Sequence, residues 1–202
     1  MTSVDGAPGR LAIVQDLANS YDAVRGRDEL VDEAAASAWL SRRGLLSVDL
    51  QLSRDEFAIV RRLRAAIRGL CLTNSGCEGH PEHIALLNEL VREAGVRPSL
   101  QRDGQPTFAV DTPGGLGCTG RILAIMFEAL WGGTWVRLKA CPGDACNYAF
   151  YDRTRNNSRT WCAMARCGSR AKMRSYRARR RKSLSSPAVD PSADVTGGPT
   201  GV

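Results

Sequence analysis

Four cysteines in a short window constrain this chain more than any other feature. They occur as two close pairs, Cys141-x4-Cys146 and Cys162-x4-Cys167, separated by fifteen residues. Each pair can supply half of a tetrahedral thiolate shell, and the chain between them brings the halves together. Soft thiolate ligands select zinc or an iron–sulfur centre over hard cations. We predict one zinc ion, because nothing in the sequence supplies a redox partner for an iron–sulfur cluster.

A shell of four cysteines leaves no open coordination position, so the predicted zinc is structural and not catalytic. The segment Pro142-Gly143-Asp144 suits a tight turn between the first two ligands. Tyr148, Phe150 and Trp161 are expected to form a small apolar core beside the metal. In a module this small, zinc binding supplies folding free energy on the order of 10–16 kcal/mol. The alternative, four unrelated buried thiols, is disfavoured by the symmetric spacing and the basic surroundings.

The remaining cysteines do not indicate a disulfide framework. The chain has seven cysteines, an odd number, and its first residues lack the charged and apolar regions of a signal peptide. The longest apolar stretch, residues 122–131, is too short to span a bilayer and contains Glu128. We therefore expect a cytoplasmic protein without a membrane association, or a nucleoid-associated one if it binds DNA.

Positive charge is concentrated near the end of the chain. Residues 153–182 hold twelve Lys and Arg and no Asp or Glu, although the whole chain has a net charge of +7. The other residues hold 16 basic side chains against all 21 acidic ones, so the rest of the protein is mildly acidic. This asymmetry indicates a polyanionic partner over the alternative of a solvated basic tail.

The basic segment after Cys167 lacks proline and is rich in good helix formers, so we predict a helix there. On a helix, Arg170, Arg174, Arg177 and Arg181 form one stripe that the zinc site would orient. The loop between the cysteine pairs adds further donors for phosphates or base edges. The predicted nucleic-acid-binding residues are Arg153, Arg155, Asn157, Arg159, Arg170, Lys172, Arg174, Arg177 and Arg181.

The sequence predicts an α+β fold with four parts: a flexible N-terminus at 1–9, a mostly helical domain at 10–138, the zinc module with its basic helix at 139–182, and a disordered tail at 183–202. Helices are expected at about 11–19, 28–44, 53–70, 81–95 and 119–131, with Asp28 and Ser53 as N-caps and Glu56 completing a capping box. Asp103-Gly104 marks a hairpin, and the alternation at 134–138 predicts a short strand.

The module resembles the CGNR zinc-finger family. The similarity lies in Trp161-Cys162-Ala163-Met164, Cys167-Gly168-Ser169-Arg170-Ala171-Lys172, Cys141-x3-Ala145-Cys146 and Phe150-Tyr151-Asp152. The N-terminal half, with Trp39-Leu40 before Gly44, is compatible with the ABATE domain that precedes this finger in the family. The resemblance implies a treble-clef-like finger, the four cysteines as metal ligands, and a proposed bacterial stress-induced transcription regulator that binds DNA. Ser169 stands where the motif has Asn, and Asn147-Tyr148 where Gly-Trp is usual.

Our leading hypothesis is a zinc-dependent DNA-binding transcription regulator that is not an enzyme. An RNA-binding protein with the same finger, or a thiol-based redox or metal sensor, are the alternatives. We expect the N-terminal domain to sense a small-molecule or protein effector, or to oligomerise. Cys71, Cys77, His80 and His83 cluster in sequence but do not predict a second metal site, because Cys71 falls on an apolar helix face and the loop is glycine-rich. Cys118 is interpreted as an incidental thiol.

Overall fold

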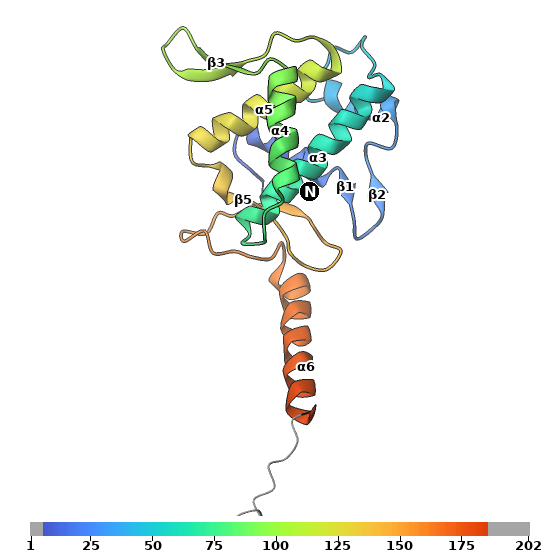
Figure 1. The fold of residues 1–202 in the computed structure, drawn as a ribbon, viewed down its shortest axis with the longest axis vertical. Helices are drawn as coiled ribbons and strands as arrows, with labels where there is room; N and C mark the ends of the chain where they lie inside the picture. The colour runs from blue at the N-terminus through green and yellow to red at the C-terminus, as the bar shows by residue number, and fades with distance from the viewer. Residues whose placement is uncertain (1–5, 186–202) are drawn as a thin grey trace, which may run out of the picture.

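The computed structural model describes residues 6–185 and shows a helical body with a long helix projecting from one end (Figure 1). The body contains α1, α2, α3, α4 and α5 together with two short hairpins, β1–β2 and β3–β4. The helices span Leu11–Asn19, Glu33–Ser41, Arg54–Asn74, Pro81–Glu93 and Gly114–Trp131, and the strands span Tyr21–Asp22, Arg27–Asp28, Arg97–Leu100 and Pro106–Ala109. The 3-10 turn Trp135–Arg137 then leads to β5 (Leu138–Ala140), β6 (Ala149–Tyr151), the π-turn Met164–Gly168 and α6 (Ser169–Ser185).

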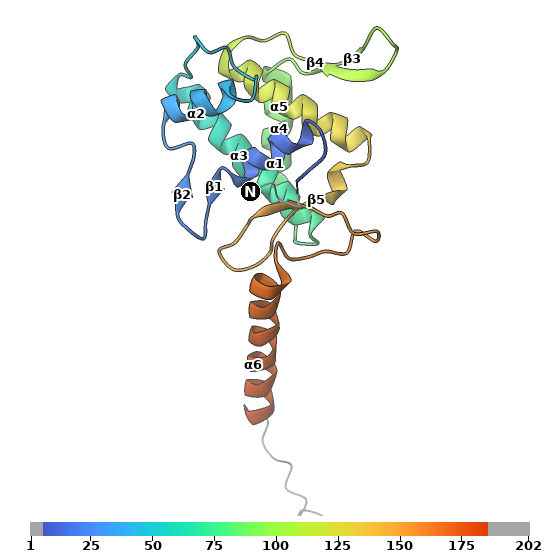
Figure 2. The same ribbon diagram turned by 180° about the vertical axis from the view of Figure 1, so that it is seen from behind.

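The core of the body forms around α3, which lies against α1, α4 and α5 (Figures 1 and 2). Val60, Leu63 and Ile67 are fully buried along one face of α3, as the helical spacing of its apolar residues predicts. Trp39 of α2 is also fully buried in this core. The sequence therefore correctly indicates which face of the central helix is covered.

Capping side chains set where two of these helices begin. Ser53 and Glu56 form the predicted capping box at the start of α3. Glu56 also uses its second oxygen, Oε1, to accept the Gly115 N–H at 2.7 Å, so one carboxylate serves the N-termini of both α3 and α5. Helix α5 consequently begins at Gly114, five residues before the predicted start, and its first turn is rich in glycine.

The prediction that Asp28 caps the second helix is wrong. Asp32 is the N-cap of α2, and its Oδ1 accepts the Ala35 N–H at 2.7 Å. Asp28 instead ends the β1–β2 hairpin and accepts two hydrogen bonds from the buried Arg64 of α3, at 2.5 and 2.9 Å. The local sequence allows either Asp28 or Asp32 to be the N-cap of α2. The ion pair with Arg64 of α3 assigns Asp28 to a different role.

The predicted hairpin at Asp103-Gly104 is confirmed, whereas the predicted strand at 134–138 is not. Strands β3 and β4 pair antiparallel, with Leu100 opposite Pro106 and Gly104 at positive φ in the turn. Residues 135–137 instead form a 3-10 turn, and the strand begins only at Leu138. The alternation there arises because Trp135 and Leu138 both face the core while Val136 is half exposed.

The β5–β6 hairpin belongs to two hydrophobic cores at once. Leu138, Ala140, Ala149 and Tyr151 pack into the core of the helical body. Phe150 points to the opposite face of the hairpin and packs with the four cysteines. Alternate residues of a strand point to opposite faces, so a pair of three-residue strands can join the two cores. The predicted boundary between residues 138 and 139 thus falls inside β5.

Polar side chains of the body fasten this hairpin further. The Asn19 side-chain amide exchanges two hydrogen bonds with the Ala149 backbone, at 2.7 and 2.9 Å, as a neighbouring strand would. Asn74 donates to the Leu138 carbonyl at 2.8 Å, and Ser75 donates to the Ala140 carbonyl at 2.6 Å. The hairpin is therefore a fixed part of the body.

The fold class is α+β, as predicted, with mostly helical secondary structure and three separate two-stranded sheets among the described residues. Residues 6–9, expected to be flexible, include a buried Ala7 whose N–H donates to Gln15 at 2.6 Å. Helix α6 continues to Ser185, three residues into the predicted tail, and residues 1–5 and 186–202 lie outside the described range. Within residues 6–185, no helix combines the length and the apolar character needed to cross a membrane.

Candidate metal centre and its basic helix

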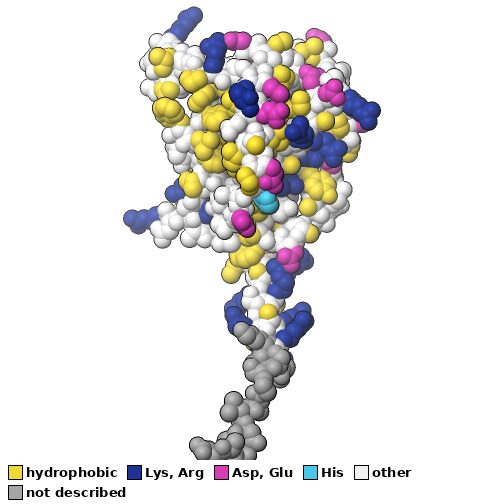
Figure 3. All heavy atoms as spheres, viewed as in Figure 1, with side chains coloured by type: hydrophobic (Ala, Val, Ile, Leu, Met, Phe, Trp, Pro, Cys, Tyr) yellow, Lys and Arg dark blue, Asp and Glu magenta, His cyan; other side chains and the backbone are white. Residues whose placement is uncertain are grey.

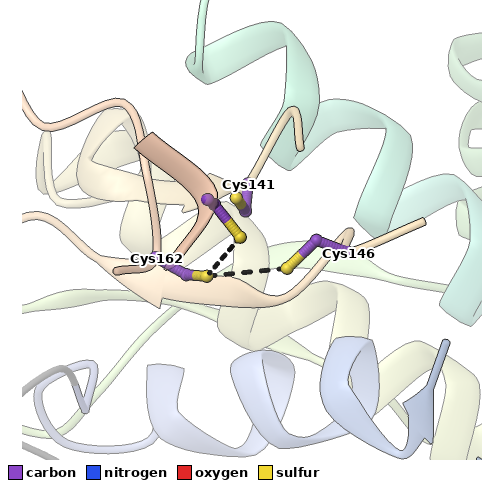
Figure 4. A group of neighbouring side chains, drawn as sticks. Cys141, Cys146 and Cys162 are labelled. Carbon is purple, nitrogen blue, oxygen red and sulfur yellow. Dashed lines mark hydrogen bonds between the residues drawn. The ribbon is translucent and has the colours of Figure 1, made fainter. Parts of the chain in front are cut away.

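The four predicted cysteines come together at one end of the body. Their sulfur atoms all lie within 4.8 Å of one another, and the four residues are buried. The Cys146 and Cys162 sulfurs are 3.5 Å apart, and those of Cys162 and Cys167 are 3.7 Å apart (Figure 4). Zn–S bonds of about 2.3 Å in a tetrahedron place sulfurs about 3.8 Å apart. These separations fit one zinc ion, and none of the thiols is in a disulfide.

Local backbone geometry brings the first pair of ligands together. Cys141 follows β5 and Cys146 precedes β6, and the Cys146 N–H donates to the Gly143 carbonyl at 2.9 Å to close the turn. A Cβ atom at Gly143 would lie 3.3 Å from the Cys167 sulfur, so the turn packs closely against the sulfurs. Ala145 adopts a positive φ of 55°, which is part of the same tight turn.

The second pair is held by the π-turn that begins α6. Cys162 precedes this turn and Cys167 lies within it. A Cβ atom at Gly168 would meet the Met164 sulfur at 2.2 Å, so any side chain there would displace the Met164 side chain. Ser169, which stands where the family motif has Asn, donates its hydroxyl to the Met164 carbonyl at 3.2 Å.

The chemistry of the donor set favours a cation at its centre. Burial raises the pKa of the Cys146 and Cys162 thiols, so these two sulfurs would keep their protons without a cation. Burial also opposes ionisation of Cys167, but hydrogen bonds from the neighbouring cysteines outweigh it and lower the pKa of that thiol. A bound Zn²⁺ supplies positive charge and stabilises the thiolates. Arg166 lies beside the cluster, and a hydrogen bond to the Cys162 sulfur raises the pKa of its guanidinium. Phe150 and Trp161 pack against the cysteines as predicted, whereas Tyr148 is 40% exposed and does not.

A buried ion pair organises the loop between the cysteine pairs. Lys139 of β5 donates to the Asp152 carboxylate at 2.9 Å, and to the carbonyls of Asn157 and Arg159 at 2.7 and 3.1 Å. Asp152 also accepts hydrogen bonds from Thr154 through Oδ1 and from the Arg159 N–H through Oδ2. Burial opposes ionisation of Asp152, but the bonds from Thr154 and Lys139 outweigh it and lower its pKa to about 2. Sequence reasoning missed this pairing, because a Lys and an Asp thirteen residues apart give no local signal of it.

Models of two known protein families match this chain. A family model described as "Putative stress-induced transcription regulator", named ABATE, matches residues 11–135. That match covers more than half of the chain. The chain belongs to the ABATE family. A second model, the CGNR zinc finger, matches residues 137–180 and contains all four cysteines. None of the curated proteins compared with the chain matches it.

The order of an ABATE domain followed by a CGNR zinc finger confirms the resemblance seen in the sequence. The four cysteines are the zinc-binding site of the finger, in agreement with one structural Zn²⁺. The regulatory description of the ABATE family agrees in general terms with the predicted role in transcription.

The loop residues predicted to contact nucleic acid differ in their surroundings. Arg155 is exposed. Arg153 donates to the Gly6 carbonyl at 2.7 Å, at the surface of the ABATE domain. Asn157 has a positive φ of 48° and a partly buried side chain. Arg159 lies with its guanidinium 4.6 Å from the centre of the Phe150 ring and donates to the Trp161 and Cys162 carbonyls. Arg159 therefore also stabilises the finger through contacts with other residues of the finger.

The helical residues predicted to contact nucleic acid lie on the projecting helix. Arg170, Lys172, Arg174, Arg177 and Arg181 are all exposed on α6. Figure 1 and Figure 2 show α6 extending from the finger away from the ABATE domain. Arg174 forms an ion pair of 2.8 Å with Asp144, in the turn between the first two zinc ligands. This pair links the helix to the metal site.

The other cysteines and the histidines do not form a second such site. Among residues 6–185, the four finger cysteines are the only group of three or more potential ligands that meets around one point. Cys71 is fully buried in the ABATE core, and burial raises the pKa of its thiol to about 12. Cys118 is also buried, and its thiol donates to the Leu45 carbonyl at 2.9 Å. Both are structural thiols.

Proposed function

We propose that this protein is a DNA-binding transcription regulator in which the zinc site holds α6 for insertion into a groove of the duplex. One observation carries the proposal: a basic helix without acidic residues begins at the metal cluster and extends away from the body. A two-stranded turn with two ligands, followed by a helix with the other two at its start, also supports a treble-clef-like finger. This role involves binding only and requires no catalytic residue.

The charge pattern of α6 favours a polyanionic partner. Arg170 and Arg174, and likewise Arg177 and Arg181, are four residues apart and repel one another on an isolated helix. The described side chains from Lys172 to Arg181 are all exposed, so packing within the chain does little to stabilise this helix. Phosphate groups along a groove would relieve the repulsion. Binding of DNA should therefore increase the helicity of α6.

The basic side chains of α6 lie on two different faces of the helix. With 3.6 residues per turn, Arg170, Arg174, Arg177 and Arg181 share a face, while Lys172 and Arg179 lie on the opposite side. Arg166, Arg170, Arg174 and Arg177 also line a shallow hollow beside the exposed Met173, at the base of the helix. We assign the arginine face to the duplex. Asp144 competes with phosphate for Arg174 and so limits the affinity.

Binding of the full-length, zinc-loaded protein to a pool of random duplex DNA, followed by fluorescence anisotropy at several salt concentrations, tests this proposal. Each phosphate contact contributes about 0.9 to the slope of log affinity against log salt. The double variant Arg170→Ala/Arg177→Ala should lower the magnitude of the slope by about 2. The matched control Lys172→Ala/Arg179→Ala removes the same charge from the other face and should change the slope less.

Equal effects of the two double variants, or an affinity that is insensitive to salt, would contradict the proposed orientation of α6 on the duplex. Competition between duplex DNA and structured RNA for the same protein separates a DNA-binding role from an RNA-binding one, and preferential binding of the RNA would overturn the proposal. Selection of bound sequences from the random pool, with a chelated protein as control, then reports any preferred target.

A redox-sensing role is less well supported by the geometry. The four cysteine residues are at most 8% exposed, which leaves peroxide little access to their sulfurs. Zinc retention during mild peroxide treatment measures this directly. Retained zinc agrees with a structural metal, and rapid release would favour the sensor.

A further inference from the structure

A pocket lies on the ABATE domain between the β3–β4 hairpin and the end of α5, and none of its lining residues is a zinc ligand. It encloses about 610 Å³ and is lined by Pro98, Leu100, Thr107, Phe108, Glu128 and Trp131, among others. Small-molecule sites in proteins commonly have volumes of about 300–1,000 Å³ and mostly apolar walls. In the view of Figure 3, hydrophobic side chains gather on the side of the body where Figure 1 places the hairpin and the end of α5.

The apolar walls of this pocket are unusually accessible to solvent. Trp131 is 77% exposed and Leu100 is 72% exposed. Large apolar side chains left in water beside one another cost free energy that burial would recover, and such groups mark binding sites. Phe108, on the floor of the pocket, is steadied by Phe127 with ring centres 5.4 Å apart. The pocket therefore offers aromatic surface on a partly rigid support.

One charged group among the lining residues determines which ligand fits. The Glu128 carboxylate accepts a hydrogen bond from the Thr107 hydroxyl at 2.9 Å through Oε1. Its other oxygen, Oε2, lies 3.8 Å from the guanidinium of Arg10, which is 60% exposed. A distance of 3.8 Å between two partly exposed groups is a weak ion pair. The carboxylate thus retains capacity for a second cation inside the pocket.

We propose that this pocket binds a small organic cation with an apolar body, such as an aromatic or alkyl ammonium ion. The apolar part would cover Leu100 and Trp131, and the positive charge would lie between Glu128 and the faces of the aromatic rings, which attract cations. An anionic ligand would meet the carboxylate and be repelled. The proposal does not depend on DNA binding, because no residue of the pocket belongs to the finger. It places a ligand site on the last ABATE helix, whose end leads through Trp135–Arg137 into β5.

A second copy of the chain is the competing occupant of such an apolar surface. A stable interface needs roughly 800 Å² from each partner, so it would have to extend well beyond the residues that line this pocket. The Glu128 carboxylate would also be buried with only the weak Arg10 ion pair to balance its charge unless the other copy supplied a cation. Charge complementarity therefore favours the small cation.

Isothermal titration of the full-length, zinc-loaded protein tests the proposal with three probes of the same ring system: naphthylmethyl-trimethylammonium, neutral naphthylmethanol and anionic naphthoate. We expect the cation to bind at least about tenfold more tightly than the neutral probe, which corresponds to about 1.4 kcal/mol. The anion should bind most weakly. Equal affinities for the three probes, or no binding of the cation, would overturn the proposal.

Two variants with opposite expected effects separate ligand binding from damage to the fold. Glu128→Gln should weaken the cation about tenfold and leave the neutral probe unchanged, whereas Arg10→Ala should strengthen the cation by about two- to fivefold because it removes the competing guanidinium. Glu89→Gln, an exposed carboxylate on α4, is the matched control and should change neither. An unchanged cation affinity in Glu128→Gln contradicts the proposal. Self-association that is lost in Trp131→Ala, without cation binding, would instead assign the surface to a second copy.

Discussion

The buried pair of Lys139 and Asp152 allows a quantitative test of how the finger is held together. The side chain of Lys139 is 5% exposed and that of Asp152 is fully buried. In Asp152→Asn, the side chain keeps its shape but replaces one oxygen with an NH₂ group. In the native structure Oδ1 accepts from Thr154 twice, and Oδ2 accepts from Lys139 and the Arg159 N–H. In either orientation, the new NH₂ therefore faces two donors.

The expected cost follows from these contacts. The variant loses two hydrogen bonds and leaves the Lys139 ammonium buried without a counter-charge. Removing one partner of a buried ion pair typically costs about 3–5 kcal/mol. Because a whole domain is stable by only about 5–15 kcal/mol, this is a large share of the total. Lys139→Met in the same background should recover part of the loss, since the double variant buries no unpaired charge. The two changes should be coupled by roughly 1–3 kcal/mol.

Urea unfolding at pH 7 and fixed free zinc, followed by tryptophan fluorescence, measures these free energies for the four proteins of the cycle. Asp49→Asn, at an exposed position of the body, is the control and should be nearly silent. Competition with a chromophoric chelator reports zinc affinity in parallel, because the loop held by the pair leads to Cys162. A loss below about 1 kcal/mol in Asp152→Asn, or strict additivity in the cycle, would refute the reasoning.

Three further outcomes are expected. Asn19→Leu should lower the unfolding free energy by about 1–3 kcal/mol, because it leaves the buried Ala149 N–H without an acceptor; denaturant titration measures this. Acid should destabilise the protein below about pH 4 and progressively towards pH 2, since Asp152, with its pKa of about 2, must take up a proton there; the fall should be shallower in Asp152→Asn. Chelation of zinc should lower the melting temperature of the ABATE domain by more than about 5 °C, because the domain shares β5–β6 with the finger; an unchanged ABATE transition in calorimetry would contradict this sharing.

Much of the fold follows from signals that lie close together in sequence. The start of α3 follows from Ser53 and Glu56, which are three residues apart and cap the helix by themselves. The hairpin at Gly104 follows from a residue that tolerates positive φ. The four metal ligands are likewise specified by spacing within two short segments. In each case the interacting groups are near neighbours in the chain, so the pattern is visible without a structure.

Some local sequence signals were ambiguous, and contacts with residues distant in sequence decided between the alternatives. Asp28 and Asp32 both suit a helix N-cap, and the buried Arg64 of α3 assigns Asp28 to an ion pair instead. The early start of α5 depends on Glu56, nearly sixty positions away, which accepts the Gly115 N–H. The local propensity of a glycine-rich segment favours a turn. Here the hydrogen bond to the Glu56 carboxylate outweighs that propensity and the segment is helical.

The sequence by itself determined that this chain binds zinc through four cysteines and continues into a basic helix, because metal ligation and charge depend on residue type and spacing. Only the tertiary structure decided how the metal site relates to the rest of the molecule. Lys139 and Phe150 share one face of a hairpin whose other face completes the ABATE core, and Arg159 turns inward onto Phe150. These contacts join residues far apart in sequence, whose burial and pairing arise only when the two cores pack on the same pair of strands.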